Sequence, residues 1–472
     1  MSVTALQERA AHIVAELAER LADPDGVAAR ATAEGNVDHL PGRAEQTPPW
    51  APLGLAEGHP GVALLFAELA DSIGGLRAAG HAHLRAAAAG LAGPQPTGLF
   101  AGPASLAHAA RLARHRPGDY ASLLDSLDAW IADRLRSLLT VERQRLDAGR
   151  AGVRLSAFDV ISGTAGLGRY LLLTPDRHRP LLEDTLTHLV RLTRPVDVNG
   201  IALPGWWAPT IPGAGPQDSV GHANLGLAHG ISGPLALLAL AWRSGVRVAG
   251  HPQAVHTIVD HLLEWQHADG SWPQVVGHDA LLAGPGGGGS SEGASGAAGS
   301  TGDGAGEGGP SGGGAGGNGR RMIAWCYGTP GVARALQLAG LALDRADWRR
   351  RAEDALSSVL GDPADALPDT SLCHGRAGVL HIATLMARDS GDPRLTARLP
   401  ALLSRVLDAY DPAQPFGFRY DRPSLPGSVS PAPHRAGFLD GAAGIALALT
   451  AHRAGPASSG AATAWDTTLL LN

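Results

Sequence analysis

The sequence predicts an all-α protein folded as an α/α toroid, in which a ring of buried helices is enclosed by a ring of outer helices. Two observations lead to this fold class. A short unit, Gly-x-x-Gly followed by an apolar run, recurs along the 472 residues, and more polar, arginine-rich stretches separate its copies. Because repetition of one short unit is the signature of a repeat architecture, the copies are expected to pack side by side.

The Gly-x-x-Gly unit occurs seven times. Its copies begin at Gly58, Gly102, Gly163, Gly230, Gly328, Gly375 and Gly441. The second copy has Ser105 where the others have their second glycine. Glycine permits a tight turn and a close approach of backbone, and the run that follows has helical spacing, as in Val62, Leu65 and Leu69. Several runs are apolar nearly all round, such as PLALLALA from Pro234, so we expect seven buried helices.

The stretches between the copies are expected to form the outer helices. DYASLLDSLDAWIADRLRSLL, from Asp119, has apolar residues at helical spacing with arginines and acids between them. A helix of this kind buries one face and leaves the other in water. Seven buried helices that alternate with such outer helices would gather their glycine turns at one mouth of the ring.

One segment departs from the repeat. Residues 284–319 are almost entirely Gly, Ser and Ala with a few acids, a composition that cannot bury a core. We expect a disordered surface insertion within a single toroid domain that spans residues 1–472. Without this insertion, the gap between the fourth and fifth copies would match the other gaps.

Composition and charge exclude several classes of partner. The net charge is −6, no lysine occurs, and the arginines form no basic stripe, so a nucleic-acid partner is not expected. The N-terminal residues carry charges throughout and lack the apolar run of a signal peptide. No stretch reaches the roughly 20 apolar residues of a transmembrane helix, so we expect a cytoplasmic protein.

The only two cysteines occupy matching positions. Cys326 lies in AWCYGTPG and Cys373 in SLCHGRAG, each two residues before the first glycine of a copy. Since equivalent positions in a ring of repeats point to equivalent places, both thiols are expected at the same mouth. In a reducing cytosol such a pair favours a metal-binding or catalytic role over a disulfide.

The position directly before the first glycine is polar in six copies of seven. It holds Glu57, Ala101, Ser162, His229, Tyr327, His374 and Asp440. Cysteine, histidine, tyrosine and acidic residues at one mouth indicate a chemical site. Cys326, Cys373 and His374 would suit zinc, which favours sulfur and nitrogen ligands in a tetrahedron and would keep a fourth position open for a substrate thiolate. The alternative is that both cysteines act only as small apolar side chains of the core.

Other conspicuous residues have simpler expected roles. Glu57 and Asp440 share the position before the glycine, where acidic residues favour helix starts, so we expect them to cap helices. Trp206 and Trp207 are expected to pack in the core rather than to line a peptide groove.

The motifs AHGISG, WCYGTPG and CHGRAG, placed within the seven copies, resemble those of the lanthionine synthetase C family, the lanthipeptide cyclases. The resemblance covers about residues 50–450. It implies a toroid of seven inner and seven outer helices and one Zn²⁺ per chain, bound by Cys326, Cys373 and His374. It also implies that the protein closes thioether rings in a precursor peptide.

The resemblance implies roles for further residues. His229 in the HGxxG copy is expected to protonate the reaction intermediate, because histidine exchanges protons near pH 7. Asp159 in FDVISGTAG would accept the thiol proton or orient His229, and Tyr327 would hydrogen-bond the enolate oxygen or a zinc ligand. An arginine upstream of the first cysteine would line the site. Arg320 and Arg321 both lie there, and Arg321 is taken as the candidate. Helix capping for His229 and Asp159, and core packing for Tyr327, are the alternatives.

The implied reaction is a Michael-type addition. A dehydratase first converts Ser or Thr of the precursor to dehydroalanine or dehydrobutyrine, and the cyclase adds a precursor Cys thiol to that residue. The zinc ion acts as a Lewis acid that holds the thiol as a thiolate. The expected partners are the dehydrated precursor peptide and a complex of dehydratase and exporter, through which the chain could associate with the membrane.

Other functions stay open on the sequence. One is intermolecular addition of a small thiol such as glutathione to a dehydrated protein, which the lysine-free, arginine-rich composition disfavours. Another is a non-catalytic scaffold that binds a peptide or a dehydratase. The complete set of predicted zinc ligands, together with His229 and Asp159, argues against this function. Glycoside hydrolases and prenyltransferase subunits can share a toroid. A glycoside hydrolase needs two facing carboxylates, which no motif here presents as clearly as the cysteines and histidines. A prenyltransferase also activates a thiol at zinc, so only a test with substrates separates it from a cyclase.

Overall fold

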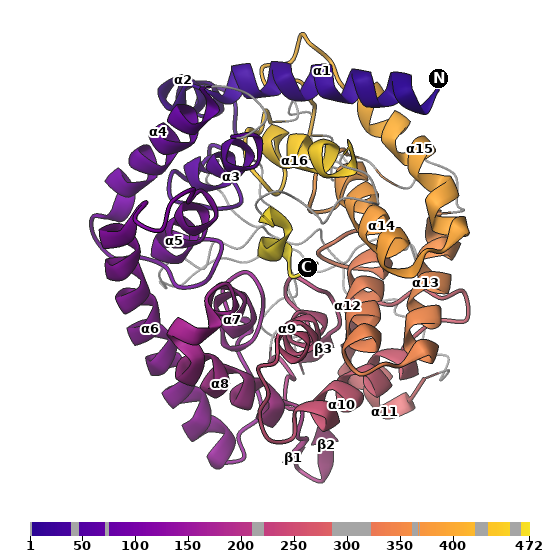
Figure 1. Ribbon diagram of the computed structural model, residues 1–472. Coiled ribbons are helices and arrows are strands. Elements are labelled where there is room, and N and C mark those ends of the chain that lie inside the picture. Colours follow the sequence, from indigo (N-terminus) through magenta and orange to yellow (C-terminus); the bar gives the residue numbers. More distant parts are fainter. Residues whose placement is uncertain are drawn as a thin grey trace.

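The computed structural model describes residues 2–38, 47–70, 75–209, 221–285, 322–360, 367, 369–420, 433–453 and 464–472. Within these ranges the chain forms the expected double ring of helices (Figure 1). Residues 286–319 of the expected insertion, together with Arg320 and Arg321, lie outside the described residues. No helix in the described part is both long enough and apolar enough to cross a membrane.

Within the described ranges, each glycine unit leads into one of seven inner helices. They are α3 (His59–Leu69), α5 (Gly102–Leu112), α7 (Thr164–Leu172), α9 (Ser232–Arg243), α12 (Thr329–Ala342), α14 (Arg376–Ser390) and α16 (Ala442–Arg453). Every residue of α3 and α7 is buried, and nearly every residue of α9. A helix with protein on all sides needs an apolar surface all round, which explains the uniform runs in the sequence.

The outer ring consists of seven amphipathic helices in the described residues. They are α1 (Val3–Leu21), α4 (Leu76–Ala88), α6 (Ala121–Asp147), α8 (Pro175–Leu192), α10 (His251–Glu264), α13 (Ala346–Leu360) and α15 (Pro393–Asp408). Figure 1 shows them enclosing the inner helices, with α1 next to α16 and α15, so that the first helix closes the outer ring. Each buries one stripe of apolar residues, as Leu395, Leu399 and Leu402 do in α15.

Several short elements complete the fold. They are the helices α2 (Pro24–Ala31) and α11 (His278–Ala283), the 3₁₀ turns η1 (Ala89–Leu91), η2 (Leu155–Ala157) and η4 (Trp465–Leu469), and the strands β1 (Val196–Val198), β2 (Ile201–Leu203), β3 (His222–Asn224) and β4 (Val275–Gly277). The strands pair antiparallel as β1–β2 and β3–β4. These strands were not expected from the sequence, because three residues are too few for a strand pattern. Trp206 and Trp207 are 2% and 3% exposed, which confirms that they pack in the core.

A closed circle of backbone hydrogen bonds links the seven turns that precede the inner helices. In every turn, the carbonyl two residues before the first glycine accepts a backbone N–H from a neighbouring turn, with N···O distances from 2.7 to 3.3 Å. The accepting residues are Ala56, Phe100, Ile161, Ala228, Cys326, Cys373 and Leu439. Leu439 in the last copy donates to Ala56 in the first, so the circle closes. Equivalent positions of the repeat therefore do face one common place.

The second glycine of the unit lets each inner helix begin against this circle. A Cβ at Gly61 would overlap the carbonyl oxygen of Leu55, and a Cβ at Gly378 would overlap that of Leu372. Only a residue without a side chain fits so close to another backbone segment. In the second copy, Ser105 takes this position, and its hydroxyl is held by a backbone carbonyl oxygen at 2.5 Å.

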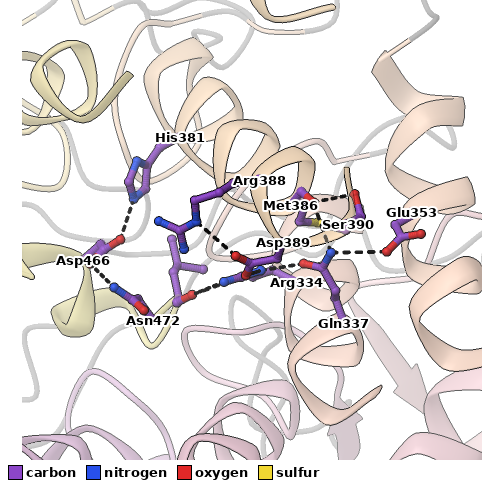
Figure 2. A network of polar contacts seen from close by, with 11 residues as sticks. Arg334, Gln337, Glu353, His381, Met386, Arg388, Asp389, Ser390, Asp466 and Asn472 are labelled. Carbon is purple, nitrogen blue, oxygen red and sulfur yellow. Dashed lines mark hydrogen bonds and ion pairs between the residues drawn. The ribbon is translucent and has the colours of Figure 1, made fainter. Parts of the chain in front are cut away.

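The last residues of the chain fill the centre of the ring, where Figure 1 shows η4 and the C-terminus. Inner helices hold this segment through buried polar contacts (Figure 2). Arg334 of α12 donates to the carbonyl oxygen of Leu471 at 2.8 Å, and His381 of α14 lies 3.1 Å from the carboxylate of Asp466. The toroid is thus a packed core rather than an open ring.

We expect Gly61→Ala to destabilise the protein by about 1–3 kcal/mol, because the new methyl group would overlap a backbone carbonyl and lie 2.8 Å from the Cβ of Phe438. Urea unfolding of the full chain measures this loss. Gly118→Ala is the matched control, since a Cβ there would meet no atom within 4 Å. Equal stabilities of the two variants would contradict the close packing of the turns.

Candidate functional site

Cys326, Cys373 and His374 meet at the mouth formed by the circle of turns. The two sulfur atoms and one ring nitrogen of His374 lie within 4.8 Å of one another. The cysteines are neighbours because the backbone N–H of Cys326 donates to the carbonyl oxygen of Cys373 at 3.3 Å. Both are buried and neither is in a disulfide. Two thiols and an imidazole at this spacing fit a metal ion that prefers sulfur and nitrogen, with three protein ligands and one further position.

The two thiols influence each other's ionisation. Hydrogen bonds with Cys373 and His374 lower the pKa of Cys326 to about 6, against the effect of burial. The contact with Cys326 and burial raise the pKa of Cys373 well above its usual value. Cys326 is therefore the thiol that ionises first. A bound cation would favour the thiolate form of both, because metal binding releases protons from its ligands.

Three side chains orient His374. Its Nε2 lies 2.7 Å from the hydroxyl of Tyr420 and 3.2 Å from Oδ2 of Asp369, and its Nδ1 lies 3.8 Å from Oδ1 of Asp440. Burial lowers the pKa of His374, but Asp440 and Asp369 raise it to about 10. A carboxylate that contacts the second nitrogen of a metal-binding histidine, as Asp369 contacts Nε2, fixes the ring and makes it a stronger ligand.

The capping role expected for Glu57 is wrong. Helix α3 begins after Gly58 without a side-chain cap, and Glu57 instead pairs with the buried Arg435 at 3.3 Å. Burial raises the pKa of Glu57 to about 8, although Arg435 opposes this shift. From the sequence, Glu57 was expected to interact only with the helix that follows it. The closed circle of turns instead places Glu57 beside residues of the last copy.

His229, which is partly buried, pairs with the fully buried Asp159 on a neighbouring turn. Nδ1 of His229 lies 2.6 Å from Oδ2 of Asp159, and the other carboxylate oxygen accepts from the backbone N–H and the hydroxyl of Ser162. Burial lowers the pKa of His229, but the hydrogen bond and charge of Asp159 outweigh it and hold that pKa above its usual value. Nε2 of His229 is then the nitrogen left to exchange a proton with a bound molecule.

Tyr327 lies beside His229, with ring centroids 6.2 Å apart. Its hydroxyl accepts a hydrogen bond from the amide of Asn224, the last residue of β3, at 3.3 Å. Burial raises the pKa of Tyr327, so the hydroxyl keeps its proton. Gly226 permits this approach, because a Cβ there would lie 2.6 Å from the carbonyl oxygen of Cys326.

The structure thus places six of the seven predicted site residues around one mouth, and the seventh, Arg321, lies outside the described residues. Sequence reasoning missed Asn224, Asp369 and Tyr420. Asn224 and Asp369 each precede the first glycine of their copy by six residues, a shared spacing that could have identified them. Tyr420 follows α15, where no repeat signal marks it.

Comparisons with known proteins identify the class. The family described as "Lanthionine synthetase C-like protein" matches residues 49–470, so this chain belongs to that family, as the motifs indicated. Nisin biosynthesis protein NisC from Lactococcus lactis subsp. lactis is 25% identical over 295 residues, which are 61% of this chain and 62% of that protein. The chain therefore aligns with less than two thirds of that relative.

A solved structure confirms the architecture. Nisin cyclase matches with a TM-score of 0.68 at 22% sequence identity, and the match covers 98% of this chain and 97% of that one. At this level of identity the likeness establishes the shared fold, the α/α toroid.

We expect Asp159→Asn to lower the pKa of His229, because the substitution removes the charge that opposes the effect of burial. Histidine-selective ¹³C labelling and NMR titration measure this pKa, with the His229 signal assigned from a His229→Gln variant. Ser162→Ala, which removes one contact to Asp159 but keeps its charge, should change the pKa less. An unchanged pKa in Asp159→Asn would show that the carboxylate does not control this histidine.

Proposed function

We propose that this protein is a zinc-dependent lanthipeptide cyclase. It would add Cys thiols of a dehydrated precursor peptide to dehydroalanine or dehydrobutyrine and so form (methyl)lanthionine rings. The observation that carries the proposal is the cluster of the buried Cys326 and Cys373 with the partly buried His374, beside the His229–Asp159 pair on the adjacent turns. Membership of the lanthionine synthetase C-like family and the names of the two similar proteins support it.

The donor set fits zinc, because two thiolates and an imidazole are the ligands this ion prefers. Nε2 of His374 is engaged by Tyr420 and Asp369, so we assign Nδ1 as the metal-binding nitrogen. When bound, zinc supplies the Lewis acidity that keeps a substrate thiol ionised near neutral pH.

His229 is assigned the proton transfer to carbon. Attack of the thiolate on the β-carbon forms the C–S bond and moves an electron pair onto the enolate, whose α-carbon must then take a proton. Asp159 holds the pKa of His229 above its usual value, which favours a proton on Nε2 near neutral pH. The proton that the thiol loses balances the proton that the α-carbon gains, and the reaction needs no other reagent.

Tyr327 is assigned the stabilisation of the negative charge that develops on the enolate oxygen. Its hydroxyl oxygen accepts from Asn224, which leaves the O–H proton to be donated elsewhere. A buried donor that is already positioned stabilises an enolate oxygen without reorganisation of solvent. A role for Arg321 and a complex with a dehydratase and an exporter stay predictions from the family resemblance. A cytoplasmic location stays a prediction from the composition of the sequence.

The test uses a dehydrated precursor peptide. Ring closure leaves the mass unchanged, so free thiols are counted by alkylation before and after incubation. We expect Cys326→Ala to lose zinc and leave the thiols free. His229→Ala should keep zinc but lose about 10²–10⁴-fold in turnover, the usual worth of a general acid.

His12→Ala is the control, because this histidine is exposed on α1, far along the chain from the mouth, and should leave turnover unchanged. Normal ring closure by Cys326→Ala would refute the zinc centre. Adducts with added glutathione in place of rings would instead support intermolecular thiol addition.

A further inference from the structure

A hollow of about 710 Å³ lies beside the outer helix α6, and its lining includes none of Cys326, Cys373 and His374. One wall is the C-terminal half of α6, and the other is the segment 150–157, which ends in η2. Its size falls in the range of about 300–1,000 Å³ that is typical of ligand sites. We call this hollow the α6 groove.

Arginine dominates the charged residues of the α6 groove. Its lining includes Arg134, Arg145, Arg150 and Arg154, and Glu142 is the single carboxylate among the described lining residues. Glu142 is already paired with Arg145 at 2.8 Å. Among the residues that the structure describes, Arg134, Arg150 and Arg154 have no carboxylate at ion-pair distance. The groove is therefore positive on a chain whose net charge is −6.

Arg145 is built into the wall of the groove, and one of its guanidinium nitrogens has no hydrogen-bond partner within the described chain. The residue is 9% exposed, its Nε donates to Glu142, and its Nη1 donates to the carbonyl oxygen of Arg150 at 2.6 Å. Its Nη2 is buried and has no hydrogen-bond partner within the described chain. A buried guanidinium N–H without an acceptor is costly, so this atom points to an acceptor that comes from a ligand.

The groove also offers apolar surface. Leu138 and Leu167 line it, and Val141, on the same face of α6, is 61% exposed. Large apolar side chains with this much exposure are rare in the described part of the chain. A peptide that carries both carboxylates and aliphatic side chains matches the arginines and the apolar surface together, whereas a phosphate or a nucleic acid would match only the charge.

We propose that the α6 groove binds a carboxylate-rich, partly aliphatic stretch of the peptide substrate that lies outside the ring-forming residues. The identity of the peptide rests on the proposed function, but the binding itself requires no catalysis. The wall of the groove leads directly to the proton-transfer pair, because the backbone N–H of Asp159 donates to the carbonyl oxygen of Leu155 at 2.9 Å. A peptide held there lies beside the turn that carries Asp159.

Fluorescence anisotropy on the full chain tests this proposal. The probe is a fluorescein-labelled peptide of Asp-Leu-Ser-Asp repeats, and its control has Asn in place of every Asp. We expect the acidic peptide to bind at least about tenfold more tightly than the Asn peptide, since charged hydrogen bonds are roughly twice as strong as neutral ones. Added salt should weaken the binding of the acidic peptide.

Two double variants separate the contribution of the groove arginines to peptide binding from the effect of the protein's net charge. Arg134→Gln with Arg154→Gln removes two lining arginines and should weaken binding roughly tenfold. Arg136→Gln with Arg143→Gln removes the same charge from exposed positions of α6 that do not line the groove, and it should change binding less than about twofold. Unfolding curves that match the wild type show that both variants are folded.

Equal weakening in the two double variants, or equal binding of the Asp and Asn peptides, would overturn the proposal. A wild-type protein that binds the acidic peptide as expected but closes no rings would contradict the proposed function alone and would leave the groove assignment in place.

Discussion

The circle of backbone hydrogen bonds between the seven turns is the constraint on which the rest of the structure depends. Each turn satisfies its buried N–H and C=O groups in its neighbours, so no turn can move alone without exposing an unpaired backbone group. The glycines allow the helices to start against this circle. Residues directly before the first glycine, distant in sequence, are thereby held around one mouth.

Electrostatics at that mouth follow from burial. Thiols, imidazoles and carboxylates that would each be costly to bury alone are paired there. Cys326 is stabilised as a thiolate by Cys373 and His374, and His229 is stabilised as a cation by Asp159. Such opposed environments let one site hold both an ionised metal ligand and a protonated acid. The pKa of His374 is raised because the carboxylates of Asp369 and Asp440 lie close to its ring. The negative charge of the same two carboxylates would stabilise a cation bound by His374.

Much of this arrangement could be predicted from the sequence, because the repeat fixed both the fold class and the common direction of the positions before the glycines. The six described site residues were found in this way or through the family motifs. Tyr420 could not be found, because a residue after α15 reaches His374 only through tertiary packing. The partner of Glu57 was missed because Arg435 lies in the last copy of the repeat, next to the first only after the ring closes. The strand that ends in Asn224 has only three residues and so shows no alternating pattern in the sequence. That Nη2 of Arg145 lacks a hydrogen-bond partner can be seen only in the folded structure, where α6 packs against its neighbours.

X-ray absorption at the zinc edge of the purified protein tests the central claim most directly, that the turns bring two cysteines and a histidine to one ion. We expect a first shell with two sulfur atoms at about 2.3 Å and at least one nitrogen at about 2.0 Å. The sulfur contribution should fall by half in Cys373→Ser. A shell of oxygen and nitrogen alone, the same in wild type and Cys373→Ser, would contradict the account.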